Sequence, residues 1–331
     1  MSPRTPLYIL PLALLLFIAS SAPIAPAQDA SGDAVPSIVC ADPLLADLVR
    51  NVVGDLATVD SIMPAGACPS HFDLRPSDAG LVADADVVVQ LGWEPWLDDL
   101  ITASGNTGVV RVRCSGLEEW NVPEGAKSYV DSLAAGLSTA IPGHAAAFAA
   151  NSAAYKASID AKAAEVLSLA RDGGLEGRAV VAMEWQVRFV EWLGCEVVAT
   201  YGPPEGLSAQ QALEVTAAAE DAIMVVDNLQ SGTDFGAEVA ARSGAVHVAL
   251  TNYPGSAPGT ETYLDMLEAN ARALVAGGQE HDQRQGEVGE LESRVEDLRF
   301  QVAALATATV VCAVAALLMG AALVRSRARR E

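Results

Sequence analysis

Short apolar runs alternate with amphipathic stretches along much of this chain, and that alternation restricts the fold more than any other feature. The runs at 37–42, 86–92 and 108–114 have the length and composition of buried strands. The stretches at 43–54 and 76–85 carry apolar residues at helical spacing. Strands that alternate with helices in this way favour a parallel sheet covered on both faces, so the sequence predicts an α/β lobe.

The same alternation returns after a long alanine-rich segment. This segment, 142–174, has a proline at its start and a glycine pair at its end, which are typical helix boundaries. A surface helix would have the same composition, but the length favours a spine helix that connects two lobes. Apolar and amphipathic stretches then alternate from 178 to 254 and close with a helix at 261–278, which predicts a second α/β lobe.

The first residues have the features of a cleavable secretory signal. Arg4 precedes an apolar run from Leu7 to Ile18, and the small residues at 25–27 form a cleavage site. We therefore expect residues 1–27 to be removed and the rest of the chain to be exported.

An uncharged apolar run near the C-terminus predicts a membrane anchor. Residues 302–324 are long enough to cross a hydrocarbon core of about 30 Å as a helix. Arginines crowd the tail at 325–331, so the positive-inside rule places that tail in the cytoplasm and the two lobes outside. The alternative is a buried helix of a soluble core, although such helices seldom lack charge for so long.

A polar linker and a short helical stalk are predicted between the second lobe and the membrane run. The linker begins at Gly277-Gly278, and apolar positions then recur three or four residues apart from Val288 to Leu305. Two interpretations stay open: a stalk that pairs two copies of the chain, or a spacer helix that continues into the membrane. The spacer is favoured because stable coiled coils usually need at least about three heptads.

The predicted fold class is therefore α/β, with two doubly wound lobes joined by a long spine helix and followed by a helical stalk and a single transmembrane helix. The divisions are a signal peptide (1–27), an N-terminal lobe (28–140), the spine helix (141–174), a C-terminal lobe (175–277), a linker and stalk (278–301), the transmembrane helix (302–324) and a basic cytoplasmic tail (325–331).

The chain is strongly acidic, with a formal net charge of -22 at pH 7. Such a field repels nucleic acid, so no nucleic-acid partner is expected, and it favours cations. An acidic surface can equally reflect solubility or a salty habitat, so the charge alone identifies no ligand.

The cysteine count gives little guidance. Of five cysteines, Cys312 lies in the apolar membrane run, and the sequence fixes no pairing among the other four. Export permits a disulfide, although Cys40 and Cys195 are more typical of small buried apolar residues.

Catalytic motifs are absent from the sequence. The chain has no nucleophile elbow, no Walker loop, no dinucleotide fingerprint and no HExxH helix. We therefore expect neither an enzyme nor an organic cofactor.

Polar and sulfur-bearing residues follow several of the predicted strands, which is where ligands bind in open parallel sheets. In the first lobe, Cys68 and His71 lie in the turn GACPSHFDLRPSD, where a thiol and an imidazole either share a metal ion or belong to a plain turn. Imidazole and carboxylate suit zinc, manganese or iron, whereas sulfur shifts the preference towards copper(I) or zinc. In the second lobe, the residues that follow strands are Met183, Glu184, Tyr201, Asp227 and Asn252.

The run from Ile38 to Ile101 resembles a known family. Its ADLVRNVVGD helix, its loop with a histidine and its PSD, ADADVVV and EPWLD segments are similar to the N-terminal lobe of the zinc/manganese solute-binding proteins of ABC importers. The second lobe and the spine helix match in order and length, so the resemblance covers residues 37–277. It implies two α/β lobes joined by one rigid helix, with a metal held between them and little hinge motion.

The resemblance also implies a set of metal ligands. His71 takes the place of the family's first histidine, displaced by one residue, and Glu118 takes the place of the second. The third histidine position falls on Met183, with Glu184 beside it. The acidic ligand of the family falls on Asp227. The implied set is His71, Glu118, Glu184 and Asp227, with Cys68, Met183 and Asn252 as further contributors.

The leading hypothesis is a membrane-anchored extracytoplasmic protein that captures a divalent transition metal, zinc or manganese, and delivers it to an ABC permease with its ATPase. One rival keeps the transport role but replaces the metal with an anionic or organic solute bound by Trp185, Tyr201 and Asn252. It is motivated by the substitution of family histidines. A second rival is a surface adhesion or scaffolding protein that forms a homodimer through its stalk, and the polar groups at most strand ends argue against it.

Overall fold

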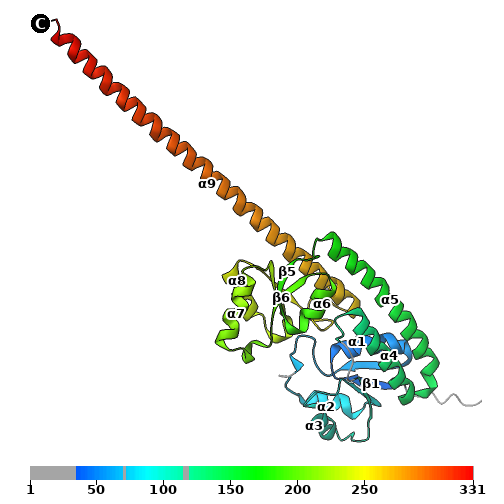
Figure 1. Cartoon of the computed structure of the whole chain (residues 1–331). Helices are drawn as coiled ribbons and strands as arrows, with labels where there is room; N and C mark the ends of the chain where they lie inside the picture. Colours follow the sequence, from blue (N-terminus) through cyan, green and yellow to red (C-terminus); the bar gives the residue numbers. More distant parts are fainter. Residues whose placement is uncertain (1–34, 70–71, 115–118, 331) are drawn as a thin grey trace, which may run out of the picture. The chain divides into compact units, whose positions relative to one another are not determined.

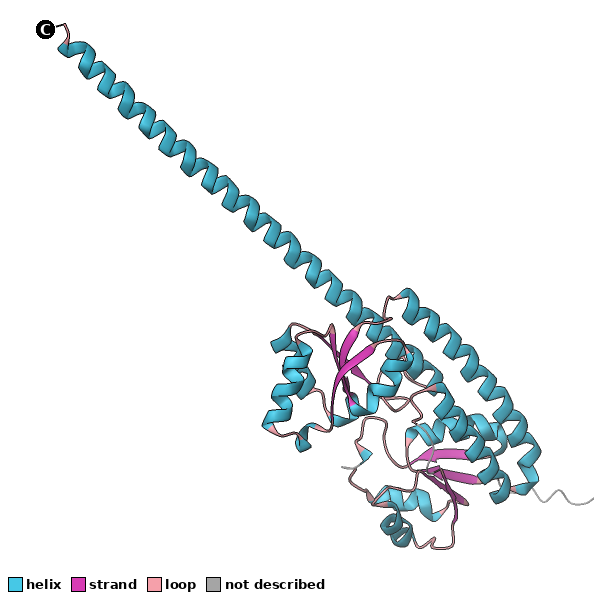
Figure 2. Ribbon diagram, viewed as in Figure 1, coloured by secondary structure: helices cyan, strands magenta, loops and turns pink. Residues whose placement is uncertain are grey.

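The computed structural model describes residues 35–69, 72–114 and 119–330. The predicted signal peptide and two of the predicted ligands, His71 and Glu118, lie outside these residues. The described chain forms two α/β lobes with separate sheets, a helix that connects the lobes and a long C-terminal helix (Figures 1 and 2). We call the first lobe the N-lobe (35–140) and the second the C-lobe (175–282).

A four-stranded parallel sheet forms the centre of the N-lobe, in the order β2-β1-β3-β4. Its strands are β1 (Ser37–Cys40), β2 (Thr58–Ser61), β3 (Val87–Gln90) and β4 (Val110–Arg113). The helices between and after them are α1 (Pro43–Val53), α2 (Pro76–Ala83), α3 (Leu97–Ser104) and α4 (Pro123–Ala140). β1 lies inside the sheet, with β2 on one side of it and β3 on the other. The connections to these two strands therefore run in opposite directions and place helices on both faces of the sheet.

Successive residues of the N-lobe strands face opposite layers. Ile38 and Cys40 belong to the large core formed with α1, α4 and the helices behind them. Val39 and Val88 belong to a separate core with α2 and α3. This period of two is the ordinary geometry of a strand, and it makes the lobe doubly wound as predicted.

The N-terminus of α1 is fixed by a buried carboxylate. Oδ1 of Asp42 accepts a hydrogen bond of 2.9 Å from the Leu45 nitrogen, and Pro43 occupies the first turn. Oδ2 has no hydrogen-bond partner among the described residues. Burial raises the pKa of Asp42 to about 7, although the hydrogen bond from Leu45 opposes that shift.

Helix α4 is an element that the sequence analysis did not predict. Two glycines let this helix lie close to the rest of the N-lobe. A Cβ at Gly125 would lie 1.9 Å from the main-chain oxygen of Glu119, and a Cβ at Gly136 would lie 2.5 Å from Cγ1 of Val112. Glycines that weaken a helical pattern in the sequence are therefore packing positions in the structure.

The C-lobe repeats the N-lobe topology. Its parallel sheet has the order β6-β5-β7-β8. The strands are β5 (Ala179–Met183), β6 (Glu196–Tyr201), β7 (Met224–Asn228) and β8 (Val246–Leu250), and the helices are α6 (Val187–Trp192), α7 (Ala209–Ala219) and α8 (Asp234–Ser243). Val225 and Met183 pack in a core with α7 and α8, whereas Val226 and Ala182 face the layer that contains α6. The prediction of two doubly wound lobes is confirmed.

Single turns of 3-10 helix connect many of these elements. They are η1 (Gly54–Leu56), η3 (Pro142–His144), η4 (Glu184–Gln186), η5 (Pro204–Gly206) and η6 (Leu229–Ser231). Two of them, η4 and η6, directly follow β5 and β7 and bring polar residues to the ends of these strands.

Helix α5 (Ala145–Asp172) connects the two lobes, as the alanine-rich segment predicts. It packs against α1 and α4 of the N-lobe and against the C-terminal helix α9 (Tyr263–Ala328). A connection made by one continuous helix has no flexible hinge of its own, which favours two lobes that move little relative to each other.

Helix α9 continues through the place where the sequence predicts a linker. Gly277 is buried in this helix, and a Cβ on it would lie 2.6 Å from Sδ of Met224 and 2.6 Å from Cγ2 of Val248. Gly277 therefore permits close packing of α9 on the C-lobe sheet instead of ending the helix. An ion pair of 2.6 Å between Arg178 and Asp282 marks the end of this contact, because residues 283–330 are exposed.

Candidate functional site

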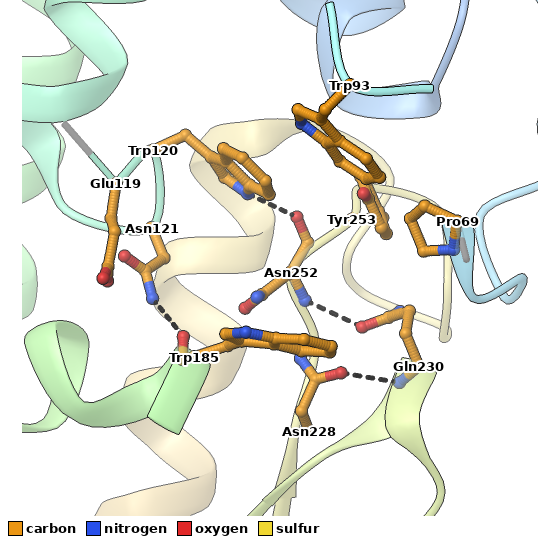
Figure 3. A pocket seen from close by; sticks show the side chains of 10 residues that line it. All are labelled: Pro69, Trp93, Glu119, Trp120, Asn121, Trp185, Asn228, Gln230, Asn252 and Tyr253. Carbon is orange, nitrogen blue, oxygen red and sulfur yellow. Dashed lines mark hydrogen bonds between the residues drawn. The ribbon is translucent and has the colours of Figure 1, made fainter. Parts of the chain in front are cut away.

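A pocket of about 400 Å³ lies between the two lobes (Figure 3). Each of its walls comes from segments that follow the carboxyl ends of strands, which is where ligands bind in parallel sheets of this kind. Its lining residues are Pro69, Trp93, Glu119, Trp120 and Asn121 from the N-lobe, and Trp185, Asn228, Gln230, Asn252 and Tyr253 from the C-lobe.

Aromatic side chains dominate the pocket. Trp93 follows β3 and Trp185 follows β5, and they are 49% and 36% exposed. Trp120 is half-buried, with its ring centroid 6.1 Å from that of Tyr253. Large apolar side chains are usually covered in a soluble domain, so the two exposed indoles at this mouth indicate a surface that receives another molecule.

Hydrogen bonds join the lobes around the pocket. Nε1 of Trp120 donates a hydrogen bond of 3.0 Å to the main-chain oxygen of Asn252. Nδ2 of Asn121 donates one of 2.8 Å to the main-chain oxygen of Trp185. On another side, Nε2 of Gln230 donates to the Ala65 oxygen over 3.2 Å. The structure is therefore that of a cleft whose lobes already touch.

Three buried amides near the pocket have one end without a partner. Oδ1 of Asn228 accepts hydrogen bonds from the nitrogens of Gln230 and Ser231 in η6, at 3.0 and 3.1 Å. Its Nδ2 has no hydrogen-bond partner among the described residues, although Asn228 is only 1% exposed. The same is true of Oδ1 of Asn121 and of Oε1 of Gln186.

Glu119 is the carboxylate among the lining residues, and these residues include neither lysine nor arginine. Partial desolvation raises the pKa of Glu119, and the positive charge of Arg188 opposes that shift. The electrostatic character of the described lining is thus neutral to negative, which disfavours an anionic ligand.

The predicted ligands that the structure describes are divided among three places. Asn252 lines the pocket, and its Oδ1 accepts a hydrogen bond of 2.8 Å from Nε2 of Gln186. Cys68 is half-buried and directly precedes Pro69 of the pocket. Glu184 lies instead beside Tyr201 in a second hollow on the C-lobe.

Met183 and Asp227 face away from the interlobe pocket. Met183 is buried in the core formed with α7 and α8. Asp227 is 1% exposed, accepts a hydrogen bond from the Tyr201 hydroxyl on Oδ1, and lies 2.8 Å from Nε2 of His247 through Oδ2. Both of its oxygens therefore have partners within the C-lobe. A Cβ at Gly236 would lie 2.0 Å from Oδ2, so α8 covers this carboxylate closely.

Strand periodicity explains this division. Asn228 directly follows Asp227 in β7, so its side chain points to the opposite face of the sheet, which is the face that reaches the pocket. The pocket contains residues that were not predicted from the sequence: Asn228, Trp93, Trp120, Asn121 and Gln230. The period of two along a strand is the signal that separates Asn228 from Asp227. Nothing comparable marks the loop residues.

The described residues do not form a ready metal centre. Within 35–69, 72–114 and 119–330, no group of three or more His, Cys, Asp and Glu side chains is arranged to hold a metal ion. All five cysteines lie in this part of the chain, and each is free. A metal in the pocket would therefore need donors from His71 or Glu118 in addition to those described.

Comparison with known proteins identifies the family of this chain. The family model described as the zinc-uptake complex component A periplasmic protein, ZnuA, matches residues 38–277. The chain belongs to this family. The resemblance seen in the sequence is thereby confirmed, and the ZnuA family comprises solute-binding components of ABC transporters rather than enzymes.

Relatives in the ZnuA family carry metal-related names. The manganese-binding lipoprotein MntA of Halalkalibacterium halodurans is 27% identical over 267 residues, which cover 72% of this chain and 87% of MntA. The high-affinity zinc uptake system protein ZnuA of Paracoccus denitrificans is 37% identical over a shorter stretch of 71 residues, 21% of this chain and 22% of that protein.

Solved structures share the fold. A Mn-bound periplasmic metal binding protein from Candidatus Liberibacter asiaticus superposes with a TM-score of 0.61 at 16% identity, over 73% of this chain and 98% of that one. The solute-binding protein FpvC of P. aeruginosa, solved with Ni²⁺, gives 0.61 at 20% identity, over 74% and 97%. These likenesses show that the chain shares the fold of these proteins.

Proposed function

We propose that this protein is the extracytoplasmic solute-binding component of an ABC importer, and that it captures a divalent transition metal, zinc or manganese, for delivery to a permease and its ATPase. The observation that carries the proposal is the pocket between the carboxyl ends of two parallel sheets, in a chain of the ZnuA family. Relatives named for manganese and zinc support the choice of cargo.

The proposed metal donors are those that border the interlobe pocket. His71 lies two residues beyond Pro69, and Glu118 directly precedes Glu119, so both are adjacent in sequence to lining residues. Cys68 and Asn252 are the described donors of the predicted set at this place. Imidazole, carboxylate and thiolate suit zinc, whereas the ligand set without sulfur suits manganese. We assign Asp227 and Met183 to the C-lobe core and Glu184 to the second hollow.

The proposed location is the outer face of the cell membrane. By length and composition, α9 contains a stretch that can cross a membrane, and the arginines at 325–330 follow that stretch. Between Asp282 and residue 302 the helix would act as a spacer that holds the lobes away from the bilayer. The apolar positions from Val288 to Leu305 are exposed, so a homodimer through this part of α9 is the alternative that a mass measurement on the detergent-solubilised chain can test.

The test of the proposed function is metal binding to the full chain in detergent. After chelator treatment, its melting temperature is measured with zinc and with manganese, because a ligand specific for the native state stabilises by about 2.7 kcal/mol at a hundredfold excess over Kd. We expect one of these metals to raise the melting temperature, His71→Ala to abolish the rise, and His144→Ala, outside the pocket, to preserve it. No response to either metal in the folded protein would refute the proposal.

A further inference from the structure

We infer that one face of α9 binds the helix of a second, different membrane protein in a parallel two-stranded coiled coil. The partner helix carries basic residues beside Glu287 and Glu292 of this chain and acidic residues beside Arg294 and Arg299. The inference goes beyond metal capture and rests on the proposed function only in the membrane anchor of α9. The face, which we call the seam, consists of Val288, Leu291, Val295, Leu298, Val302 and Leu305.

The seam is open to solvent along its whole length. Its six side chains are between 46% and 68% exposed, and steps of three and four residues place them on one face of the helix. The contact of α9 with the C-lobe ends near Asp282, so no described part of the lobes covers this face. The positions from Val288 to Leu298 precede the apolar run at 302–324 and lie in water. A continuous apolar stripe in water indicates a surface that another molecule covers.

The branching of the seam residues specifies the number of strands. Its valines occupy the a positions of the heptad and its leucines the d positions. A β-branched residue at a with leucine at d favours two parallel strands. The seam falls short of the roughly three heptads that a free coiled coil needs. Anchoring in one bilayer raises the effective concentration of two helices for each other, which offsets the short contact.

The residues that flank the seam oppose the pairing of two identical chains. In a parallel coiled coil, a residue at a g position faces the residue five positions further along the other helix, at an e position. Glu287 would therefore face Glu292 of a second copy, and Arg294 would face Arg299. The symmetry of the pair repeats both contacts. Like charges at these positions select against the pair.

A displaced pair of identical chains would bring opposite charges together, but the membrane anchor opposes it. Sliding one copy by one heptad would place Glu287 opposite Arg299 and Arg294 opposite Glu292. The same slide would displace the two apolar runs by about 10 Å along their axes. Both runs cross the same hydrocarbon core of about 30 Å, so one of them would no longer match the bilayer. An antiparallel pair is excluded because both C-terminal ends lie on the same side of the membrane.

A partner helix with the opposite charges satisfies the whole pattern. Lysine or arginine opposite the two glutamates, and aspartate or glutamate opposite the two arginines, would turn all four flanking contacts into ion pairs. Exposed ion pairs add little affinity each, but charges at e and g positions determine which helices pair and in which direction. The affinity comes from burial of the seam. The partner therefore leaves the same membrane in the same direction as α9.

The experiment uses a charge-exchanged copy of the full chain as the partner. This copy carries Glu287→Lys, Glu292→Lys, Arg294→Glu and Arg299→Glu, which leave its net charge, its seam and its apolar run unchanged. Parent and charge-exchanged chains, with donor or acceptor fluorophores at the C-terminus, are reconstituted in phosphatidylcholine vesicles, and energy transfer is measured against the ratio of protein to lipid. We expect the mixed pair to associate at least about tenfold more strongly than either chain with itself. The preference is expected to shrink at about 1 M salt, because salt screens ion pairs.

Two changes in the parent chain test whether the seam is the contact. Leu291→Ser together with Leu298→Ser removes apolar contacts from the seam and is expected to abolish energy transfer to the charge-exchanged copy. Phe300→Ser serves as the matched control, because Phe300 is 76% exposed and lies on the face of α9 opposite the seam. Energy transfer from the Phe300 variant is expected to equal that of the parent.

The outcomes decide what covers the seam. Parent chains that associate with each other as strongly as with the charge-exchanged copy would overturn the inference in favour of a homodimer. Chains that associate in no combination would overturn it as well, because the seam would then bind no helix. A full chain that does not enter the vesicles would refute the membrane anchor and the inference with it.

Metal capture is tested separately on the same chains. The response of the melting temperature to zinc and manganese in the variant with Leu291→Ser and Leu298→Ser is expected to equal that of the parent, because the seam lies outside the interlobe pocket. Loss of association with a retained metal response would refute only the partner helix. A missing metal response with retained association would refute only the proposed cargo.

Discussion

The indole of Trp120 in the N-lobe donates a hydrogen bond of 3.0 Å to the main-chain oxygen of Asn252 in the C-lobe. This bond crosses the cleft at the pocket itself, so it ties ligand binding to the contact between the lobes. Replacing Trp120 by phenylalanine keeps an aromatic ring against Tyr129 and Tyr253 but removes the donor.

Trp120→Phe is therefore expected to lower the free energy of unfolding by about 1 kcal/mol, the usual net worth of such a hydrogen bond. Urea denaturation followed by circular dichroism measures the change. Trp192→Phe, at a residue outside the pocket, controls for loss of a tryptophan. Equal stability of the Trp120 variant and the parent would show that the cleft is not held by this bond.

Asp42 gives the protein a pH dependence with a definite sign. Burial raises its pKa to about 7 from an ordinary value of 3.8, so between these pH values the folded state binds more protons than the unfolded state. Stability contributed by this group is complete below about pH 4 and is lost as pH rises towards about 7. The full shift corresponds to about 4 kcal/mol as an upper estimate.

Asp42→Asn is expected to reduce this pH dependence, because asparagine can still cap α1 but does not titrate. Denaturation midpoints at pH values from 4.5 to 8 measure it, with the exposed Asp55→Asn as the control. A slope that is the same in the parent and in the Asp42 variant would contradict the assignment.

Asp227 is expected to serve stability rather than cargo binding. Its oxygens are engaged by Tyr201 and His247, away from the interlobe pocket. Asp227→Asn should lower stability by about 1 to 3 kcal/mol, because one partner loses its acceptor in a buried place. The affinity for zinc, measured by calorimetry, should change less than twofold. A loss of affinity above tenfold would restore Asp227 as a metal ligand.

Two glycines of α9 form a matched pair. Gly277→Ala places a methyl group 2.6 Å from Met224 and Val248 and is expected to cost about 1 to 3 kcal/mol of stability through overpacking. Gly286→Ala meets no atom within 4 Å and is expected to cost nothing, because alanine is a better helix former. Urea denaturation of both variants checks the contrast.

Membrane attachment has its own test. Ending the chain after Glu287 removes the apolar part of α9 but keeps the ion pair between Arg178 and Asp282. The shortened chain is expected to partition into the aqueous fraction of lysed cells with an unchanged melting temperature, whereas the full chain is expected to stay with membranes. A full chain that remains in the aqueous fraction would argue against the anchor.

The sequence predicts the two lobes well because periodicity and strand length are local properties. Apolar runs such as those that become β1 and β3 predict buried strands, and the alternation of these strands with helices predicts a parallel sheet. These local patterns do not predict helix α4 or the continuation of α9 through Gly277. There, glycines that normally interrupt helices serve close packing between elements distant in sequence.

The candidate site is less predictable because it depends on which way a side chain points. Asp227 and Asn228 are neighbours at the end of one strand, yet one is covered by α8 and the other reaches the pocket. Loop residues such as Trp93 and Trp120 of the N-lobe meet Trp185 of the C-lobe only through the pairing of the lobes, which no local pattern encodes.

If the apolar run of α9 spans a membrane as proposed, the continuity of this helix would fix the rotation of the lobes about the helix axis as well as their height. About 20 residues separate Asp282 from residue 302, so the lobes would stand about 30 Å above the start of the apolar run. Each residue of an α-helix also turns the chain by about 100°. Inserting one residue there would lift the pocket by only about 1.5 Å but would swing its mouth by more than a quarter turn. If the apolar run spans a membrane as proposed, the length of this rod would therefore set the direction in which the pocket opens as well as its height.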